Sequence, residues 1–325
     1  MDFMLNLQVP KASELLHHQQ KILSVGSCFT EHIGNALSEL KFEVLQNPNG
    51  ILFDPASVCH SLVSYIQNKE YKEEDLFLLN EVWQSWNHHS RFSGVDKEDV
   101  LRKINQSSHA AHHFLKDANW LIITLGSSFS YRLVNEQMLP VANCHRGPQQ
   151  WFEKYLMPIS ETVERLDNAI HQLFHFNRKL NIIFTISPVR HIRDGVMENN
   201  RSKARLIEAV HHLVNKFDGL FYFPSYELVI DVLRDYRFYD IDMVHPNYLA
   251  TEFVLQKFLE TFMSSDTYRL TQEIKALVVS SRHKPTHPTT DAHKKFLRSN
   301  YDKVKNLKQQ YPYLDFEKEL EYFSK

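Results

Sequence analysis

Five short apolar runs, separated by longer segments with helical periodicity, constrain the fold more than any other feature of this sequence. The runs lie at residues 22–25, 42–45, 120–125, 181–186 and 220–223. Several are apolar over nearly their whole length, as is typical of strands covered by helices on both faces. Strands that alternate with helices predict a parallel sheet. We therefore expect an α/β fold with a doubly wound, flavodoxin-like parallel sheet of about five strands, whose sites lie at the carboxyl ends of the strands.

The helix signals between these runs differ in strength. Asp54 followed by Pro55 predicts an N-cap and a first helical turn, with the helix extending to about residue 66. Further helices are expected at 31–40, 96–116, 202–217 and 246–262. Residues 76–92 and 131–150 interrupt the alternation, and we expect a small hairpin or loop at each.

The pattern changes near residue 265. Beyond it, charged helical segments surround a stretch rich in Pro, His and Thr at 285–290. A chain of 325 residues accommodates one large domain with an appendage. We therefore predict a core domain at 1–264 and a C-terminal helical extension at 265–325.

Composition and charge exclude several classes of protein. The formal net charge is −2 and no segment concentrates Lys and Arg, which argues against a nucleic-acid partner. No run approaches eighteen apolar residues, so we expect no membrane span. The beginning of the sequence lacks the order of a secretory signal, and the three cysteines share no metal-ligand spacing. We expect a cytoplasmic protein without a metal or other cofactor; its oligomeric state is left open.

Ser27 is the first candidate for chemistry. It follows Gly26 where the first strand ends and a helix begins. Glycine permits a sharp turn, and the helix start offers unpaired N–H groups that suit an oxyanion. A serine here is also a common N-cap, so the turn alone leaves both interpretations open.

Asp242 and His245 are the second candidate, three residues apart just before the last core helix. Pro246 is expected to fix the start of that helix, which would place His245 at its N-terminus. Asp242 could orient the imidazole and select its tautomer. The alternative is a turn cap beside an ordinary surface histidine. Both groups belong to the same edge of the predicted sheet as Ser27, which favours a nucleophile–base pair.

The sequence also offers a second possible nucleophile and one possible metal-ligand set. Cys28 could replace Ser27, although a buried small apolar side chain is the simpler interpretation. His109, His113 and Asp117 share one predicted helical face and could form a metal-ligand line, but a solvated helix face is the favoured interpretation.

At this point the sequence resembles the GSCFA family, which is assigned to the SGNH/GDSL-like hydrolases. The resemblance spans roughly residues 20–262 and rests on separated segments in the same order. These are Gly26-Ser27-Cys28-Phe29, Asn47-Pro48-Asn49-Gly50, Thr124-Leu125-Gly126, Ala142-Asn143-Cys144-His145, Ser187-Pro188-Val189-Arg190-His191, the stretch 233–239 and the block from Asp242 to His245.

The resemblance implies a Ser–His–Asp triad in an esterase, lipase or O-acyl transferase. Carried onto this chain, Ser27 is the nucleophile, His245 the general base and then acid, and Asp242 the residue that orients it. The implied substrate is a small-molecule or carbohydrate ester. A Gly-x-Ser-x-Gly elbow is absent around Ser27, which excludes the α/β-hydrolase arrangement.

The implied oxyanion hole departs from the superfamily pattern. The N–H groups of Ser27 and Gly50 match two of the usual donors. The third block normally supplies Gly-x-Asn, whereas this chain has Gly126-Ser127-Ser128. We therefore expect Asn143 as the third donor, with Gly126 and Ser128 as alternatives. Losing one donor typically costs about 10²–10³ in rate.

Four basic side chains are candidates for substrate binding: His88, Arg190, His191 and Arg237. Guanidinium groups bind carboxylates and polar sugars through paired hydrogen bonds. The arginines could equally form structural ion pairs, with Asp235 as one partner. The leading hypothesis is a serine-dependent ester hydrolase or acyltransferase; the alternative is a non-catalytic binding or scaffold protein that retains the fold.

Overall fold

The computed structural model describes residues 5–134 and 138–324 and confirms the α/β class. Its centre is a five-stranded parallel sheet of order β10-β9-β5-β1-β2. These strands are β1 (Lys21–Gly26), β2 (Glu43–Gln46), β5 (Trp120–Leu125), β9 (Asn181–Ile186) and β10 (Leu220–Phe223). If these five strands are numbered along the chain, their order in the sheet is 5-4-3-1-2, which is the predicted flavodoxin-like order. It reverses between β1 and β5, the point where such folds bind ligands.

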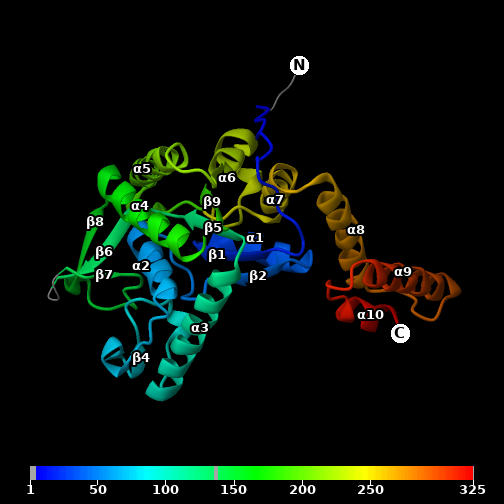
Figure 1. Cartoon of the computed structure of the whole chain (residues 1–325), viewed down its shortest axis with the longest axis horizontal. Helices are drawn as coiled ribbons and strands as arrows, with labels where there is room; N and C mark the ends of the chain where they lie inside the picture. Colours follow the sequence, from blue (N-terminus) through cyan, green and yellow to red (C-terminus); the bar gives the residue numbers. More distant parts are fainter. Residues whose placement is uncertain (1–4, 135–137, 325) are drawn as a thin grey trace.

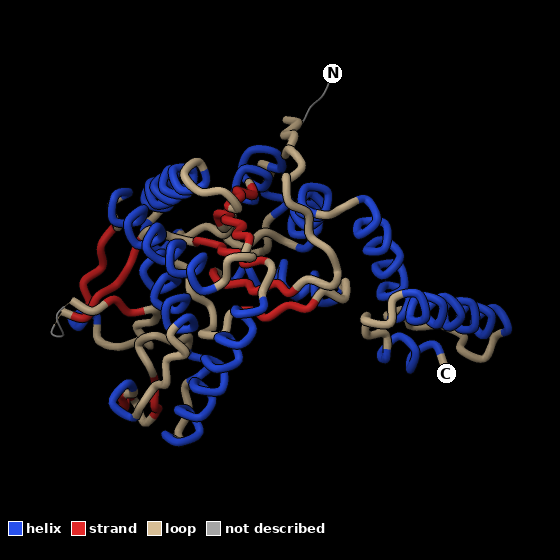
Figure 2. The backbone as a smooth tube through the Cα atoms, viewed as in Figure 1, coloured by secondary structure: helices blue, strands red, loops and turns tan. Residues whose placement is uncertain are grey.

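Helices cover both faces of this sheet (Figures 1 and 2). One face carries α2 (Pro55–Ile66), α3 (Lys97–Asp117), α4 (Ile159–Phe176) and α5 (Val196–Val214), and the other carries α1 (Cys28–Glu39) and α7 (Tyr248–Phe262). Within β5, Leu121 and Ile123 pack into the core beneath α2, α3, α4 and α5, whereas Trp120 and Ile122 pack into the core beneath α1 and α7. This alternation is what a strand buried on both sides requires.

Several predicted boundaries are confirmed and others are wrong. The Asp54 carboxylate accepts from Ser57 N at 3.2 Å and caps α2 as expected. Two helices begin earlier than predicted: α1 starts at residue 28 rather than 31, and α5 at 196 rather than 202. The predicted start of α7 at Pro246 is wrong because Asn247 is the N-cap, its side chain accepting from Ala250 N at 3.2 Å. The expected alternation includes a helix between β5 and β9, and α4 occupies this place, but its bounds were not predicted.

The two interruptions are small antiparallel sheets. A hairpin of β3 (Phe77–Leu79) and β4 (Val82–Gln84) confirms the first prediction. The second is larger than expected, with β6 (Phe129–Leu133) pairing both β7 (Pro140–Val141) and β8 (Phe152–Leu156). Residues 135–137 of that prediction lie outside the described residues. Short 3-10 helices lie at Glu73–Asp75, Ser90–Phe92, Gln149–Trp151, Ile192–Asp194 and Tyr236–Phe238; α6 (Ser225–Glu227) continues into a π-helical turn at Leu228–Leu233.

The C-terminal segment is helical, as expected. It contains α8 (Ser265–Ser281), α9 (Asp291–Gln310) and α10 (Glu317–Phe323), which lie together at one end of the molecule (Figure 1). These helices share an apolar cluster of their own that includes Ile274 and Phe316. Lys41, just after α1, forms an ion pair of 2.9 Å with Glu319, which joins the segment to the core. The domain boundary at 264/265 stays a prediction.

Across residues 5–134 and 138–324, no helix combines the length and the apolar character that crossing a bilayer requires.

Candidate active site

The turn after β1 depends on Gly26. Its φ is +147°, and a Cβ at this position would lie 2.2 Å from the Thr124 carbonyl oxygen. Only glycine therefore lets β1 approach β5 so closely just before Ser27. The Asn47 side chain accepts from Gly26 N at 2.9 Å and holds the turn from the side of β2.

Ser27 occupies the N-cap position of α1, but its hydroxyl does not cap the helix. The side chain is 2% exposed, and Oγ has no hydrogen-bond partner among the residues that the structure describes. A buried hydroxyl without a partner typically costs about 1–3 kcal/mol, so such groups require an explanation. This one lies at the point where the strand order reverses, between the ends of β1 and β5.

Asp242 and His245 form a closed unit. Asp242 Oδ2 lies 2.6 Å from His245 Nδ1, and Oδ1 accepts from the backbone N–H groups of Val244 at 2.9 Å and His245 at 3.0 Å. These hydrogen bonds, first that of the His245 amide, lower the pKa of Asp242 to about 2. The carboxylate is therefore ionised at neutral pH and fixes one ring nitrogen of His245, which leaves Nε2 for another partner.

His245 lies beside the first turns of α1 and the loop after β9. Burial lowers the pKa of His32 on α1, and the charge of His245 lowers it further. Burial likewise lowers the pKa of His191 to about 4, with contributions from Lys203 and His245. The loop after β9 is joined to the Asp242–His245 segment, because the backbone N–H of Arg190 donates to Val244 O at 3.2 Å. Ser27 Oγ makes no hydrogen bond with His245, so the triad stays a prediction.

His191 and Ser27 face the same point at the end of β5. A Cβ placed on Gly126 would lie 2.9 Å from Phe53 Cβ, 3.2 Å from His191 Nε2 and 3.3 Å from Ser27 Cβ. The three side chains therefore surround Gly126, which leaves room between them that any larger residue would fill. Sequence reasoning named His191 as a substrate contact but gave no reason to place its ring beside Ser27.

The expected backbone oxyanion donors already have acceptors. Ser27 N–H donates to Thr124 O at 3.0 Å, Gly50 N–H to Asn47 O at 2.7 Å, and Gly126 N–H to Phe53 O at 2.7 Å. An oxyanion at Ser27 would share these donors or displace their present acceptors.

The expected side-chain donors lie apart from one another. Asn143 Oδ1 accepts from His145 N–H at 2.8 Å, which leaves its amide nitrogen available. Ser128 stays a prediction as well, although its fully buried hydroxyl donates to Ser202 O on α5 at 3.1 Å. Asn143 as the third donor stays a prediction.

Lys203 is a buried charge that sequence reasoning missed. It is 1% exposed, and its Nζ donates to the carbonyls of Gly126 and Ser187 at 2.6 Å each. These carbonyls belong to the ends of β5 and β9, so the amine joins the two strand ends beside Ser27. Burial lowers the pKa of Lys203 to about 7. In the sequence it is one polar position on an amphipathic helix, which carries no signal of this role.

A large cavity opens beside this cluster, and we call it the carboxyl-edge cavity. Its volume is about 1070 Å³, and its lining includes Phe53 and His191 from the surroundings of Ser27. Most of the remaining lining comes from the β6–β8 sheet, from the segment Val141–Gly147 and from the loop that follows β9. The space available therefore greatly exceeds what a single acetyl group would occupy.

Two of the predicted substrate contacts lie outside this cavity. His88 is 1% exposed and its Nδ1 is 2.9 Å from Ser85 Oγ, whereas its neighbour His89 lines the cavity; a substrate contact of His88 stays a prediction. Arg237 is exposed and pairs with Asp235 at 3.1 Å, which confirms the structural alternative. Arg190 and His191 both line the cavity.

The other nucleophile and ligand hypotheses find little support. Burial raises the pKa of Cys28, which disfavours the reactive thiolate. His109 Nδ1 lies 2.8 Å from Asn68 Oδ1 rather than beside another candidate ligand. In the described part of the chain, no three His, Cys, Asp or Glu side chains are placed to hold a metal ion.

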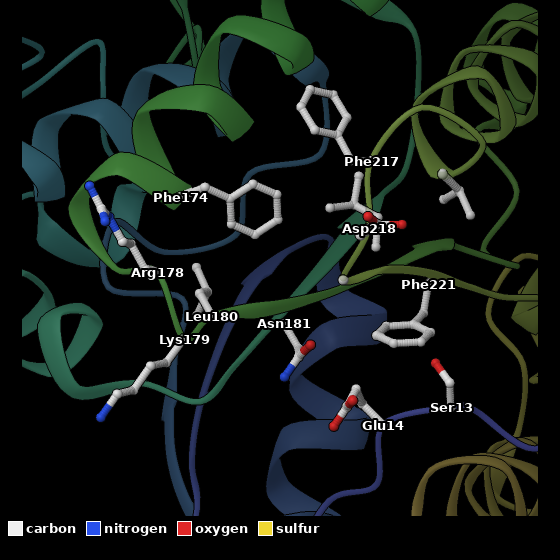
Figure 3. A pocket seen from close by; sticks show the side chains of 13 residues that line it. Ser13, Glu14, Phe174, Arg178, Lys179, Leu180, Asn181, Phe217, Asp218 and Phe221 are labelled. Carbon is white, nitrogen blue, oxygen red and sulfur yellow. The ribbon is translucent and has the colours of Figure 1, made fainter.

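A second cavity of about 830 Å³ lies at the opposite edge of the sheet (Figure 3). We call it the amino-edge cavity. It is formed by the end of α4, the starts of β9 and β10, and Ser13 and Glu14 of the N-terminal segment. Phe174, Phe217 and Phe221 supply its aromatic surface.

Sequence comparison decides the family. Residues 21–258 match the GSCFA family over most of the chain. The chain belongs to the GSCFA family. Residues 274–325 of this GSCFA protein match a second description, "GSCFA domain protein, C-terminal domain". No curated protein was found to match its sequence.

Among solved structures, this GSCFA protein is similar to three esterases at low identity. The carbohydrate esterase family 3 protein of Talaromyces cellulolyticus is 9% identical, with a TM-score of 0.37 and coverage of 79% of this chain and 99% of that one. The family 3 carbohydrate esterase of Clostridium thermocellum is 10% identical, with a TM-score of 0.33 and coverage of 77% and 97%. The acetyl xylan esterase Est2A of Butyrivibrio proteoclasticus is 9% identical, with a TM-score of 0.38 and coverage of 79% and 64%.

Proposed function

We propose that this GSCFA protein is a serine-dependent ester hydrolase or acyltransferase that acts on O-acyl groups of a polar or carbohydrate substrate. The observation that carries the proposal is the buried, unpartnered Ser27 hydroxyl at the reversal of strand order. A general explanation of such a group is a substrate or a base that completes its hydrogen bonding. The adjoining carboxyl-edge cavity supplies space for the acyl group and its carrier.

In the proposed reaction Ser27 Oγ attacks the ester carbonyl while His245 Nε2 takes the hydroxyl proton. Asp242 stabilises the imidazolium that forms. Collapse of the tetrahedral intermediate breaks the ester C–O bond, and His245 returns the proton to the leaving alcohol. Water or an acceptor hydroxyl then attacks the acyl-enzyme carbonyl and gives its proton to His245. The acyl C–Oγ bond breaks as His245 returns that proton to Ser27 Oγ, which releases an acid or a new ester.

His191 is our additional candidate for the third oxyanion donor. Because burial holds the pKa of His191 near 4, its ring is neutral at pH 7 and carries one N–H. Its Nε2 and the Ser27 side chain border the same point at Gly126. We propose this point as the position of the oxyanion in the tetrahedral intermediate. A neutral imidazole N–H is a suitable donor there. Asn143, from the segment Val141–Gly147, remains the competing candidate for this donor.

A binding protein that retains the fold is the second candidate function. The feature that favours it is the set of backbone N–H groups at the site that already have acceptors, together with the missing Ser27–His245 hydrogen bond. The expected cytoplasmic location belongs to the same proposal and is consistent with Cys28, Cys59 and Cys144 being free thiols.

Hydrolysis of aryl acetates by the purified full chain tests the proposal. The wild type is expected to release the phenol faster than Ser27→Ala and His245→Ala, while Asp235→Asn, which removes a charge from an exposed pair, should match the wild type. Equal rates for the wild type and the Ser27→Ala protein would refute the nucleophile and favour the binding function.

A further inference from the structure

The carboxyl-edge cavity has an uneven distribution of charge. Besides three histidines, its lining has four arginine or lysine side chains but a single carboxylate: Arg146, Lys154, Arg190, Arg193 and, as the acid, Asp194. Lys154 and Asp194 pair with each other, so their charges cancel. The remaining surplus is positive and comes from guanidinium groups.

Arg190 is engaged by the protein itself. Its guanidinium donates to Met243 O at 3.2 Å and lies 4.0 Å from the centre of the Tyr239 ring. These contacts hold the Asp242–His245 loop and explain Arg190 as a structural residue. It is therefore not the group that the cavity leaves for a ligand.

Arg146 and Arg193 have no such explanation. Neither forms a hydrogen bond through its side chain, or an ion pair, with any residue in 5–134 or 138–324. Burial raises the pKa of Cys144 to about 11, and the charge of Arg193 opposes that increase, which places Arg193 near the turn that carries Arg146. Two exposed guanidinium groups without partners among the described residues thus lie on the wall of one cavity.

The turn that presents Arg146 is tightly held. His145 and Arg146 have φ values of 48° and 58°, and Gly147 N–H donates to Cys144 O at 2.7 Å, which closes a tight turn. Two consecutive left-handed residues are typical of a type I′ turn, and Asn80 and Glu81 between β3 and β4 have the same conformation. His145 Nε2, 2.8 Å from Ser85 O, holds the turn against the segment that follows β4.

Aromatic rings form much of the rest of the wall. Phe129, Tyr131 and Phe152 come from the β6–β8 sheet, and Lys154 lies 4.5 Å from the centre of the Phe129 ring. Apolar walls with a few fixed polar groups are typical of small-molecule sites. Guanidinium groups favour planar or tetrahedral oxyanions, which they bind through paired hydrogen bonds.

We propose that the carboxyl-edge cavity binds an anionic group, a carboxylate or a phosphate, on the sugar-like part of the ester substrate, through Arg146 and Arg193. The inference rests on the proposed function, because it makes this group part of the molecule whose acyl ester meets Ser27. The aromatic wall would hold the uncharged part of the same substrate. Specificity would then come from the β6–β8 insertion rather than from the central sheet.

Pairs of acetylated sugars with and without a charged group test the proposal, with the released acetate as the readout. O-acetylated glucuronic acid and its methyl ester carry the same acetyl group, and a parallel pair compares acetylated glucose 6-phosphate with acetylated glucose. In one of the two pairs, the wild type should show a kcat/KM at least about tenfold higher for the anionic substrate than for its neutral partner. The pair that shows this difference identifies the anion as a carboxylate or a phosphate. The double variant Arg146→Gln/Arg193→Gln should lose this preference, so that its kcat/KM for the anionic ester falls to the level of its neutral partner.

The matched control is Arg178→Gln, which removes a guanidinium from the amino-edge cavity and should leave the preference intact. Equal kcat/KM values for charged and neutral esters in the wild type would overturn the proposal. So would a preference that survives in the double variant.

A binding measurement separates this inference from the proposed function. Calorimetry on the full-length Ser27→Ala protein, which needs no turnover, should show at least about tenfold tighter binding of an anionic ester than of its neutral partner. If neither ester is hydrolysed by the wild type but this difference is present, the reaction fails and the anion site stands. If Ser27→Ala binds both equally, the anion site is refuted whatever the activity.

Discussion

The two cavities lie at opposite edges of one sheet and have comparable volumes, about 1070 and 830 Å³. They differ in the polar groups around them. The carboxyl-edge cavity adjoins a buried hydroxyl without a partner and a histidine with a lowered pKa, and a buried lysine lies close by. The amino-edge cavity is lined by strand starts, aromatic rings and exposed charges (Figure 3). Volume therefore does not distinguish a site in this fold, whereas the convergence of strand ends and helix starts does.

The largest expected effect is on catalysis at one edge only. Ser27→Ala should lower kcat/KM on an aryl acetate by about 10⁴-fold or more, because the nucleophile is removed. Ser13→Ala, the same change at the amino-edge cavity, should leave the rate unchanged. Steady-state kinetics on both variants checks this, and comparable losses would remove the distinction between the edges.

The next effect separates the candidate oxyanion donors. His191→Ala should lower kcat by about 10²–10³ with little change in KM, because the lost hydrogen bond forms only in the transition state. Asn143→Ala should change kcat by less than about twofold if His191 is the donor. The opposite ranking would assign the role to Asn143.

A pair of glycine variants sharpens the comparison. In Gly126→Ala the new methyl group would lie 2.9 Å from Phe53 Cβ and beside the Ser27 side chain, so activity should fall about tenfold or more through misplacement. Gly219→Ala, at the amino-edge cavity, meets nothing closer than 3.6 Å but forces alanine to a φ of +77°. It should lower the free energy of unfolding by about 1–2 kcal/mol and leave activity unchanged.

Both quantities, rate and denaturant midpoint, are measured on each protein. A Gly219→Ala protein that folds well but loses activity would show that the amino-edge cavity is coupled to the reaction, against the comparison.

A further contrast between the two edges is a pH dependence of stability that comes from Lys203. Burial lowers the pKa of this amine to about 7, whereas in the unfolded chain it is about 10.4. Between these values the unfolded state binds more protons, so stability should rise with pH from about 7 to about 10. Lys203→Met should flatten this rise, and Lys179→Met at the amino-edge cavity should not. Thermal unfolding across this pH range measures both.

The sequence was most informative where one physical constraint acted alone. Apolar runs fixed the positions of the strands, because burial on both faces tolerates few polar residues, and the Gly26–Ser27 turn followed from where β1 ends. The Asp242–His245 hydrogen bond was likewise expected from their spacing. The start of α7 was misplaced because two N-terminal signals compete there, and the asparagine prevailed over Pro246.

What the sequence could not show are contacts made across the fold. Lys203 is one polar residue in a helix until β5 and β9 bring two carbonyls to it. His88 and His89 are indistinguishable in sequence, yet the structure buries the first and lines the cavity with the second. Such differences depend on packing between segments far apart in the chain, which local patterns do not encode.

Covalent labelling with a fluorophosphonate tests the central claim most directly. In the wild-type protein we predict a single adduct, located by peptide mass spectrometry on Ser27, and its loss in His245→Ala while folding is retained. An unlabelled Ser27 in well-folded wild-type protein, or an adduct that forms equally without His245, would contradict the account.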